Sequence, residues 1–181
     1  MSRINTVTTE TANAEQRALF DAIQGQLGIV PNFLKVFANS PAALRAFLGL
    51  HGIANEGSLD PQTGERIALA VAQQNSCEYC VSAHTAIGRK AGLNSAEIEA
   101  NRTGTSQDAK AAVAVKLARS LVDNMGEVTT AEITEARDAG YSDAEIVEII
   151  THVGMNILTN LIGKASRVEI DFPKVALNLA A

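Results

Sequence analysis

The amino-acid sequence predicts an all-α protein, a multihelical bundle in which residues 1–181 form one domain. Hydrophobic residues make up 46% of the 181 residues, enough to build a core. Alanine is abundant, whereas the aromatic residues are limited to five Phe and two Tyr, a composition that suits closely packed helices better than strands. Signals for the beginnings and ends of helices recur along almost the whole chain. The length is typical of one domain.

Four helix starts are marked by capping residues, taken here in the order of the chain. Ser40-Pro41 and Asp60-Pro61 each place a capping side chain before a proline at the first helical position. Thr129-Thr130-Ala131-Glu132 and Ser142-Asp143-Ala144-Glu145 are capping boxes, in which a hydroxyl group and a carboxylate satisfy backbone N–H groups of the first turn. We therefore expect helices to begin at residues 41, 61, 130 and 143.

Two helix ends are marked by Gly92 and Gly140, because glycine readily adopts the left-handed conformation that often ends a helix. Turn-rich stretches at residues 56–60 and 103–106 separate further helices but are too short to link two domains. These signals and the spacing of apolar residues predict helices at residues 11–27, 32–38, 41–55, 61–74, 77–91, 95–101, 106–125, 130–139 and 143–164. The tail, residues 167–181, loses helical periodicity, and we expect it to lie across a neighbouring subunit.

Charge and hydropathy restrict the partners. The 15 Lys and Arg residues against 20 Asp and Glu give a net charge of −5, without the basic cluster that binding to nucleic acid requires. The longest uninterrupted apolar run, Ile67–Ala72, is far shorter than the roughly 20 residues that cross a bilayer. The N-terminal residues 1–6 do not resemble a secretory signal. We expect a cytoplasmic protein that binds neither nucleic acid nor membrane.

Both cysteines fall in one short segment, Cys77-Glu78-Tyr79-Cys80, and His84 follows four residues later. On a helix over residues 77–91, Cys77, Cys80 and His84 share one face, because residues three or four apart are neighbours. The thiolate is the reactive form of cysteine. A helix N-terminus stabilises a thiolate at Cys77, and the His84 imidazole can take the proton of Cys80. Spacing alone leaves open which cysteine attacks first, and we favour Cys80.

Glu65 joins this motif through the expected geometry of the chain. Residues 73–76 form a polar break between two apolar helices, and an antiparallel pair of helices around that break brings Glu65 level with His84. A carboxylate in that place can orient the imidazole or accept its proton, as the third group of a catalytic triad does. We therefore predict a catalytic site formed by Cys77, Cys80, His84 and Glu65.

The pattern of Glu65, Cys77, Cys80 and His84, set in Glu65-Arg66-Ile67-Ala68-Leu69 and Ser82-Ala83-His84, resembles the carboxymuconolactone decarboxylase superfamily, specifically its alkyl hydroperoxidase D-like, peroxidase-related branch. Residues 156–160 and 169–173 resemble the C-terminal half of many peroxidase-related members, so the resemblance covers roughly residues 25–173. The resemblance implies the all-α alkyl hydroperoxidase D-like fold and homo-oligomers, either trimers or hexamers.

The resemblance also implies a function for the cysteine pair, either the reduction of hydroperoxides or the transfer of electrons from a lipoyl or thioredoxin-like donor to a peroxiredoxin. One residue departs from the family pattern. The characterised hydroperoxidase has a histidine directly before its second cysteine, and this chain has Tyr79 there. That difference removes one step of the proton relay proposed for the family.

Motif and resemblance together predict a thiol-dependent antioxidant peroxidase. In this scheme a Cys80 thiolate, deprotonated through His84 and Glu65, attacks the peroxide, and Cys77 resolves the sulfenic acid to a redox-active disulfide. A dithiol reductant, a lipoyl or thioredoxin-like protein, then restores the pair. Two other functions stay open: a disulfide-reducing electron-transfer adaptor for a peroxiredoxin, and a cofactor-free decarboxylase of the carboxymuconolactone type, against which the cysteine pair counts.

Structural interpretations of the same cysteines are also open. Cys77, Cys80 and His84 could supply three zinc ligands, but the sequence offers no second cluster to complete a tetrahedral site. Both cysteines could simply be small buried hydrophobic residues. We expect redox use, with no metal ion and no other cofactor.

Four further polar residues are expected to have structural roles. His152 lies in an apolar segment and is expected to be a hydrogen-bonded packing residue. Asn156 and Asn160, one turn apart, are expected to bond to backbone groups or to a neighbouring subunit. His51 is expected to make a favourable contact with the dipole at the end of its helix.

Overall fold

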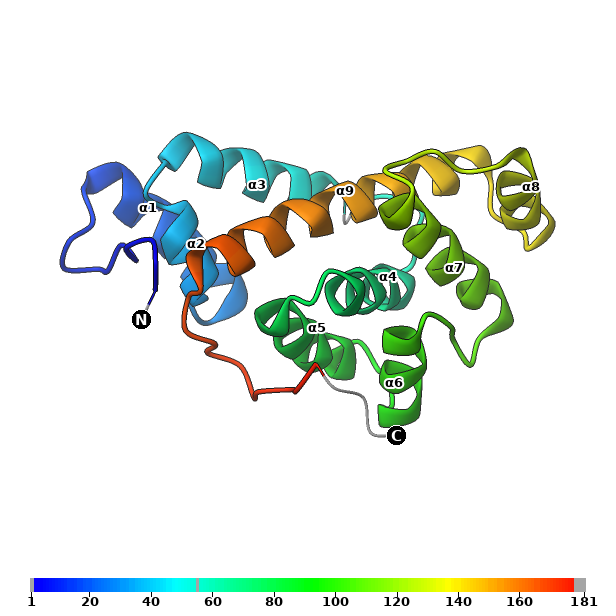
Figure 1. Ribbon diagram of the computed structural model, residues 1–181. Helices are drawn as coiled ribbons and strands as arrows, with labels where there is room; N and C mark the ends of the chain where they lie inside the picture. Colours follow the sequence, from blue (N-terminus) through cyan, green and yellow to red (C-terminus); the bar gives the residue numbers. More distant parts are fainter. Residues whose placement is uncertain (1, 55, 178–181) are drawn as a thin grey trace.

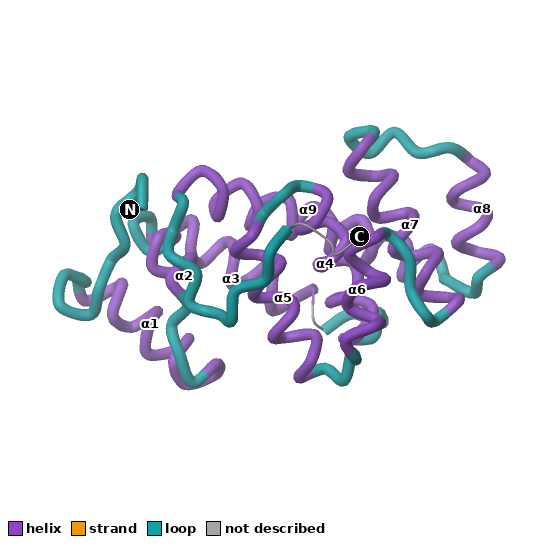
Figure 2. Tube along the Cα trace, turned by 60° about the horizontal axis from the view of Figure 1, so that its bottom comes forward, coloured by secondary structure: helices purple, strands orange, loops and turns teal. Residues whose placement is uncertain are grey.

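The computed structural model describes residues 2–54 and 56–177, and within these ranges it contains α-helices and no strand (Figures 1 and 2). The prediction of an all-α fold is confirmed. The helices are α1 (Ala14–Leu27), α2 (Asn32–Phe37), α3 (Pro41–Ala54), α4 (Pro61–Gln74), α5 (Glu78–Lys90), α6 (Ser95–Thr103), α7 (Ala109–Asp123), α8 (Thr130–Asp138) and α9 (Asp143–Ser166). In both views α1 and α2 lie at one end of the molecule, and α7 and α8 lie at the other.

The central helix is α4, which contacts α5, α6, α7 and α9. Its start matches the sequence signal, because the Asp60 side chain accepts a hydrogen bond from Thr63 N at 2.9 Å and Pro61 occupies the first turn. From Ile67 to Ala72 every side chain of α4 is at least 98% buried. This burial on all sides explains why the segment is a continuous apolar run rather than an amphipathic one.

The reversal between α4 and α5 positions the cysteine motif. Asn75 ends α4, and Ser76 has a positive φ of 53°, a left-handed conformation that is uncommon outside glycine. Cys77 then caps α5, so the chain turns back within three residues. The predicted antiparallel pair of helices around the polar break is therefore present.

The long helix α9 crosses the molecule and contacts α2, α3, α4, α5, α7 and α8 (Figure 1). Among the described residues it is also the one helix long and apolar enough to cross a membrane, with a mean hydropathy of 1.4. Half of that window is buried inside the structure. The finding is weak evidence for a membrane span, because the core helix of a globular protein meets the same test.

After α9 the chain forms a strap, residues 168–177, that passes along α5 (Figure 1). Val175 N donates to Ser82 Oγ at 3.0 Å, and Gln73 Nε2 donates to the Leu177 carbonyl at 2.8 Å. α5 of the same chain thus offers these residues both an apolar surface and hydrogen-bond partners, and the expectation that the tail lies across a neighbouring subunit stays a prediction. Residues 178–181 lie outside the described part.

Most helix bounds agree with the sequence signals, and three starts differ, the smallest difference being that of α5, which begins at Glu78 rather than at residue 77. The first helix begins at Ala14 rather than at residue 11, because Asn13 and Gln16 form a capping box. The helix expected from residue 106 begins at Ala109, because Asp108 is its cap and the preceding loop binds Glu97 instead. Residue 55, the expected end of the third helix, lies outside the described residues.

Candidate functional site

Cys77 and Cys80 are joined by a disulfide at the start of α5, with their Cα atoms 5.3 Å apart. Cys77 is the N-cap of α5 rather than its first residue, and its Sγ accepts a hydrogen bond from Cys80 N at 3.3 Å. The two residues are only 1% and 4% exposed. The N–H group and the helix dipole that face Cys77 favour negative charge on its sulfur when the bond is open.

Glu65 and His84 form the second part of the site, one helical turn beyond Cys80. Glu65 Oε2 on α4 lies 2.9 Å from His84 Nδ1 on α5. The two side chains are 19% and 21% exposed, so solvent reaches this pair more readily than the disulfide. The predicted contact is therefore present, and the structure brings the four predicted site residues together at one hairpin. Their catalytic roles remain predictions.

The other two histidines of the chain, His51 and His152, lie close enough to interact electrostatically with Glu65 and His84. Burial lowers the pKa of His152, against a hydrogen bond to the Ala54 backbone and the charge of nearby carboxylates, which raise it. Burial also lowers the pKa of His51, and the nearby His84 imidazole lowers it further. Both imidazoles therefore favour the neutral form at neutral pH. Sequence spacing did not indicate this grouping, since the two residues come from α3 and α9.

His152 approaches α4 where Gly64 leaves room. A Cβ atom on Gly64 would lie 3.3 Å from His152 Cε1, closer than most side chains tolerate. His152 is only 6% exposed, and its ring packs against Gly64, the residue that precedes Glu65 on α4. The expectation of a packing residue thus agrees with its burial, and its proximity to the Glu65–His84 pair is an addition.

Tyr79, which stands where the characterised hydroperoxidase has histidine, faces the C-terminal strap. Its hydroxyl group donates to Asp171 Oδ1 at 2.7 Å and accepts from Phe33 N at 3.3 Å. Burial, and then the bond to Asp171, raise the pKa of Tyr79 far above its ordinary value. The phenol therefore stays protonated and anchors α2 and the strap to α5, rather than moving protons at the disulfide.

Two residues of α9 that sequence reasoning did not assign to the site lie against the turn that carries the cysteines. A Cβ atom on Gly163 would lie 3.1 Å from Cys77 Sγ and 3.7 Å from Cys80 Sγ. Asn160, one turn earlier, accepts a hydrogen bond from Asn75 Nδ2 through its Oδ1 at 2.9 Å. Glycine at position 163 lets α9 approach the disulfide closely, so this helix forms a wall of the site.

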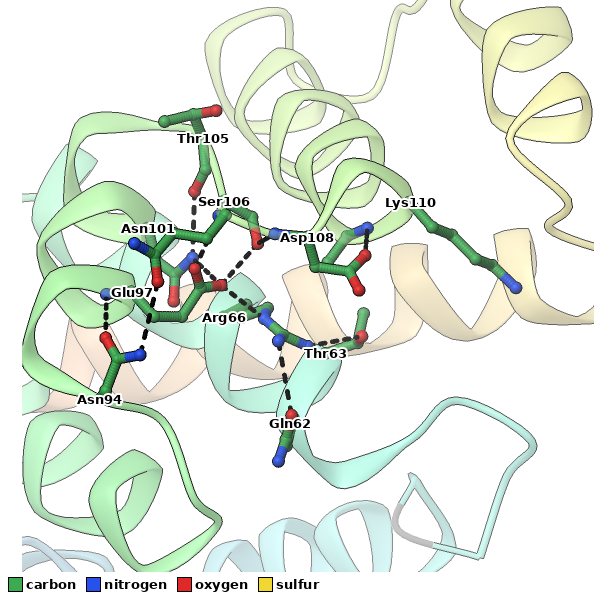
Figure 3. Close-up of polar contacts among 12 residues, drawn as sticks. Gln62, Thr63, Arg66, Asn94, Glu97, Asn101, Thr105, Ser106, Asp108 and Lys110 are labelled. Carbon is green, nitrogen blue, oxygen red and sulfur yellow. Dashed lines mark hydrogen bonds and ion pairs between the residues drawn. The ribbon is translucent and has the colours of Figure 1, made fainter.

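A buried ion pair, drawn with its polar neighbours in Figure 3, joins α4 to α6. Arg66 Nε donates to Glu97 Oε1 at 2.7 Å, and Glu97 also accepts from Asn101, Ser106 and the Gln107 backbone. Burial by itself would raise the pKa of Glu97, but these hydrogen bonds outweigh it and lower the pKa to about 2. The cluster ties α6 and the loop before α7 to α4, and it is structural.

The described residues contain no group of three or more His, Cys, Asp and Glu side chains arranged to hold a metal ion. A polar cavity of about 410 Å³ opens at the starts of α4 and α7, lined in part by Asp60, Arg66 and Asp108. Its carboxylates already cap helices, as Asp60 does for Thr63 N and Asp108 for Ala111 N. Neither finding adds a residue to the candidate site.

Fold and site together define a helical protein with a C-x-x-C disulfide and a carboxylate–imidazole pair in one hairpin. The sequence model of the carboxymuconolactone decarboxylase family matches residues 41–123, which include this hairpin. The cysteine hairpin is thus similar in sequence to the carboxymuconolactone decarboxylase family, and the whole fold is similar to that of alkyl hydroperoxidase D-like, peroxidase-related proteins. A search of curated proteins gave no significant match.

Solved structures share the fold over nearly the whole chain. An uncharacterized peroxidase-related protein from Silicibacter sp. TM1040 is 26% identical, with 93% of this chain and 94% of that chain covered and a TM-score of 0.80. Another, with an alkylhydroperoxidase AhpD core, from Ralstonia eutropha JMP134, is 22% identical, with coverages of 94% and 92% and a TM-score of 0.84. A variant of the debrominase Bmp8 in complex with 2,3,4-tribromopyrrole is 17% identical, with coverages of 94% and 92% and a TM-score of 0.77.

Proposed function

We propose that the protein is a thiol-dependent, peroxidase-like oxidoreductase that reduces organic hydroperoxides through a Cys77–Cys80 dithiol/disulfide cycle. The observation that carries the proposal is the place of His84, which lies one helical turn after Cys80 and has its Nδ1 2.9 Å from Glu65 Oε2. An imidazole held by a carboxylate beside a thiol is the arrangement that activates cysteine nucleophiles. The name of the 26% identical Silicibacter structure, a peroxidase-related protein, supports the same class of chemistry.

The oxidative steps follow from the order of these groups. In the reduced protein His84 takes the proton of the Cys80 thiol, and Glu65 stabilises the imidazolium ion. The Cys80 thiolate attacks a peroxide oxygen, the O–O bond breaks, and the alcohol leaves with a proton from His84. Cys80 is then a sulfenic acid, and the Cys77 thiolate attacks its sulfur and releases water. An external dithiol, lipoyl or thioredoxin-like, reduces the disulfide again.

The working form is proposed to be a cytoplasmic homo-oligomer, a trimer or hexamer. α9 carries four large apolar side chains that stay exposed in the single chain, namely Val147, Ile150, Leu158 and Leu161, with exposures of 37% to 61%. They lie on one helix, and contiguous exposed apolar surface marks interaction sites. Self-association would cover this face.

An electron-transfer adaptor for a peroxiredoxin is the alternative. The observation that favours it is Tyr79, whose hydroxyl group is bound to Asp171 and does not serve as the relay that histidine provides in the characterised hydroperoxidase. In that case the substrate is the disulfide of another protein. A cofactor-free decarboxylase has less support, because such chemistry does not use the cysteine pair.

Stopped-flow oxidation of the reduced protein tests the proposal and separates it from the adaptor. The reduced chain is mixed with hydrogen peroxide, cumene hydroperoxide or a fatty-acid hydroperoxide, and free thiols are counted with time. Loss of two thiols per chain in the wild-type protein, with survival of the single Cys77 thiol in the Cys80→Ser variant, supports the peroxidase. Survival of both thiols in excess peroxide, together with fast reduction of a peroxiredoxin disulfide, would favour the adaptor.

A further inference from the structure

The inward face of α9 carries two buried asparagines in different states. Asn156 Nδ2 donates to the His152 carbonyl at 2.8 Å, so its amide group is satisfied within the helix. Asn160 is 1% exposed, and its Oδ1 accepts from Asn75 Nδ2. In the described part of the chain, Asn160 Nδ2 meets no hydrogen-bond acceptor. A buried donor without an acceptor is costly, so a fold that keeps one calls for an explanation.

The position of Asn160 relative to the disulfide supplies one. Gly163, three residues further along α9, approaches so closely that a Cβ atom there would lie 3.1 Å from Cys77 Sγ. Helix residues three apart are neighbours, with Cβ atoms about 5–6 Å from each other. The partner of Asn160 is Asn75, two residues before Cys77, and Lys164 Nζ fixes the same turn through the Asn75 carbonyl at 2.6 Å. The orphan amide therefore lies beside the turn that holds Cys77.

We propose that Asn160 Nδ2 donates a hydrogen bond to Cys77 Sγ when the disulfide opens, and so stabilises the Cys77 thiolate; the inference rests on the dithiol/disulfide cycle proposed above. A disulfide sulfur is a weak acceptor, whereas a thiolate is a full negative charge that needs donors. Cys77 Sγ already accepts from Cys80 N, and Asn160 supplies the second donor. The Asn160 amide, which is unpaired in the oxidised protein, thus has a thiolate to bind in the reduced protein.

A hydrogen bond from Asn160 to Cys77 determines which sulfur the reductant attacks and which sulfur leaves when the disulfide is reduced. A thiolate of the external dithiol attacks Cys80 Sγ and forms a mixed disulfide, while the Cys77–Cys80 bond breaks and its electron pair leaves on Cys77. The second thiol of the dithiol then attacks the mixed disulfide, releases Cys80 and leaves the dithiol oxidised. Because a thiol of lower pKa leaves faster, stabilisation of the Cys77 thiolate accelerates the first of these steps.

Asn160→Leu tests the inference, with Asn156→Leu as the matched control on the same buried face. The reduced proteins are alkylated with iodoacetamide across a pH series, and mass spectrometry follows Cys77 and Cys80 separately. We expect the apparent pKa of Cys77 to rise by about one unit or more in Asn160→Leu, a tenfold loss of thiolate at neutral pH, because hydrogen bonds to charged groups are strong. Reduction of the disulfide by dithiothreitol should slow severalfold as well, because a leaving thiol of higher pKa leaves more slowly. The control should change neither value.

Two further variants keep the inference falsifiable if Asn160→Leu does not fold. Asn160→Asp retains the size of the side chain and places a carboxylate near the thiolate, so the Cys77 pKa should rise further. Asn75→Ala, at a half-buried position, releases the amide and should raise the Cys77 pKa by a smaller amount. An unchanged Cys77 pKa in the folded variants, or an equal rise in Asn156→Leu, would overturn the inference.

The readout does not depend on peroxide, so the two proposals fail separately. A wild-type protein that ignores every peroxide but shows the Cys77 shift in Asn160→Leu would reject the peroxidase and retain the donor. If the wild-type protein consumes peroxide but Cys77 has the same apparent pKa in the folded Asn160 variants as in the wild type, the peroxidase is retained and the donor role of Asn160 is rejected.

Discussion

Glu65 Oε2 and His84 Nδ1 lie 2.9 Å apart although 19 residues separate them in the chain. The contact exists because α4 and α5 reverse around Ser76, whose left-handed backbone lets the two helices run side by side. The pair is about one-fifth exposed, whereas the neighbouring disulfide is almost completely buried. Solvent protons and small molecules therefore reach the imidazole more readily than the sulfur atoms.

Replacing either member of this pair should slow the oxidation of the thiols without unfolding the protein. Glu65→Gln keeps the shape of the side chain and removes the charge that stabilises the imidazolium ion. Loss of one positioned acid–base group costs about 10² to 10⁴ in rate. We expect Glu65→Gln and His84→Gln each to reduce the stopped-flow rate with peroxide by about that much.

The double variant decides whether the two residues act as a unit. Groups that act together are not additive, so Glu65→Gln with His84→Gln should be little slower than either single variant. Circular dichroism and sedimentation serve as controls for fold and assembly. If the losses multiply in the double variant, Glu65 and His84 act independently and the relay has to be abandoned.

The sequence predicts much of this hairpin because its signals are local. The spacing of Cys77, Cys80 and His84 requires only that one helix forms, and the polar break at residues 73–76 requires only that two helices reverse. Glu65 follows from those two statements. The capping residue Asp60 and the capping boxes give the helix starts in the same way, since each involves residues three apart.

The parts of the site that the sequence did not reveal come from distant helices. Asn160 pairs with Asn75 across 85 residues, and Gly163 contacts the disulfide only because α9 lies across the hairpin. Their place depends on how α9 packs, which no local pattern encodes. His51 also reaches the site from another helix, α3. Gly163 and the two asparagines, Asn156 and Asn160, indicate close packing in an apolar helix, but they do not identify the segment that packs there.

Tyr79→Phe should separate anchoring from catalysis. The phenol group holds Asp171 of the strap, and Asp171 is exposed, so loss of this hydrogen bond should lower the free energy of unfolding by about 1 kcal/mol. The oxidation rate should stay within about twofold, because the protonated phenol takes no part in the thiol chemistry. Urea unfolding and stopped-flow oxidation measure the two effects. A tenfold slower oxidation in a stably folded Tyr79→Phe protein would contradict this and assign Tyr79 a part in the thiol chemistry.

The exposed face of α9 should govern assembly. Leu161 is 61% exposed and shares its helix with Val147, which is equally exposed. A charge in a buried apolar interface is strongly unfavourable, so Leu161→Glu should dissociate the oligomer into chains near 19.0 kDa in sedimentation at micromolar concentration. Met125→Glu is the control, because Met125 is 90% exposed but lies off this face. A wild-type protein that already sediments as a monomer would refute the interface.

Glu97 should set the acid limit of stability. Its folded pKa, about 2, lies below the ordinary value of 4.5, so its contribution to stability is complete above pH 4.5 and is lost as the pH falls toward 2. At about 1.4 kcal/mol per pKa unit, the difference corresponds to about 3 kcal/mol of unfolding free energy. Urea unfolding between pH 7 and pH 3 should show about 2 kcal/mol of this loss in the wild-type protein, because at pH 3 the folded carboxylate is still ionised.

Glu97→Gln should remove most of that pH dependence and lower stability already at pH 7. The Arg66 guanidinium group would stay buried without its carboxylate, a change that typically costs about 3–5 kcal/mol. Glu15→Gln is the matched control, because Glu15 pairs with Arg45 on the surface, where an ion pair contributes at most about 1 kcal/mol. Equal losses in the two variants would mean that the Arg66–Glu97 pair is no more than a surface ion pair. A Glu97→Gln protein as stable as the wild type at pH 7 but without its acid sensitivity would show that Arg66 finds other acceptors, such as Gln62 and Thr63, in place of the carboxylate.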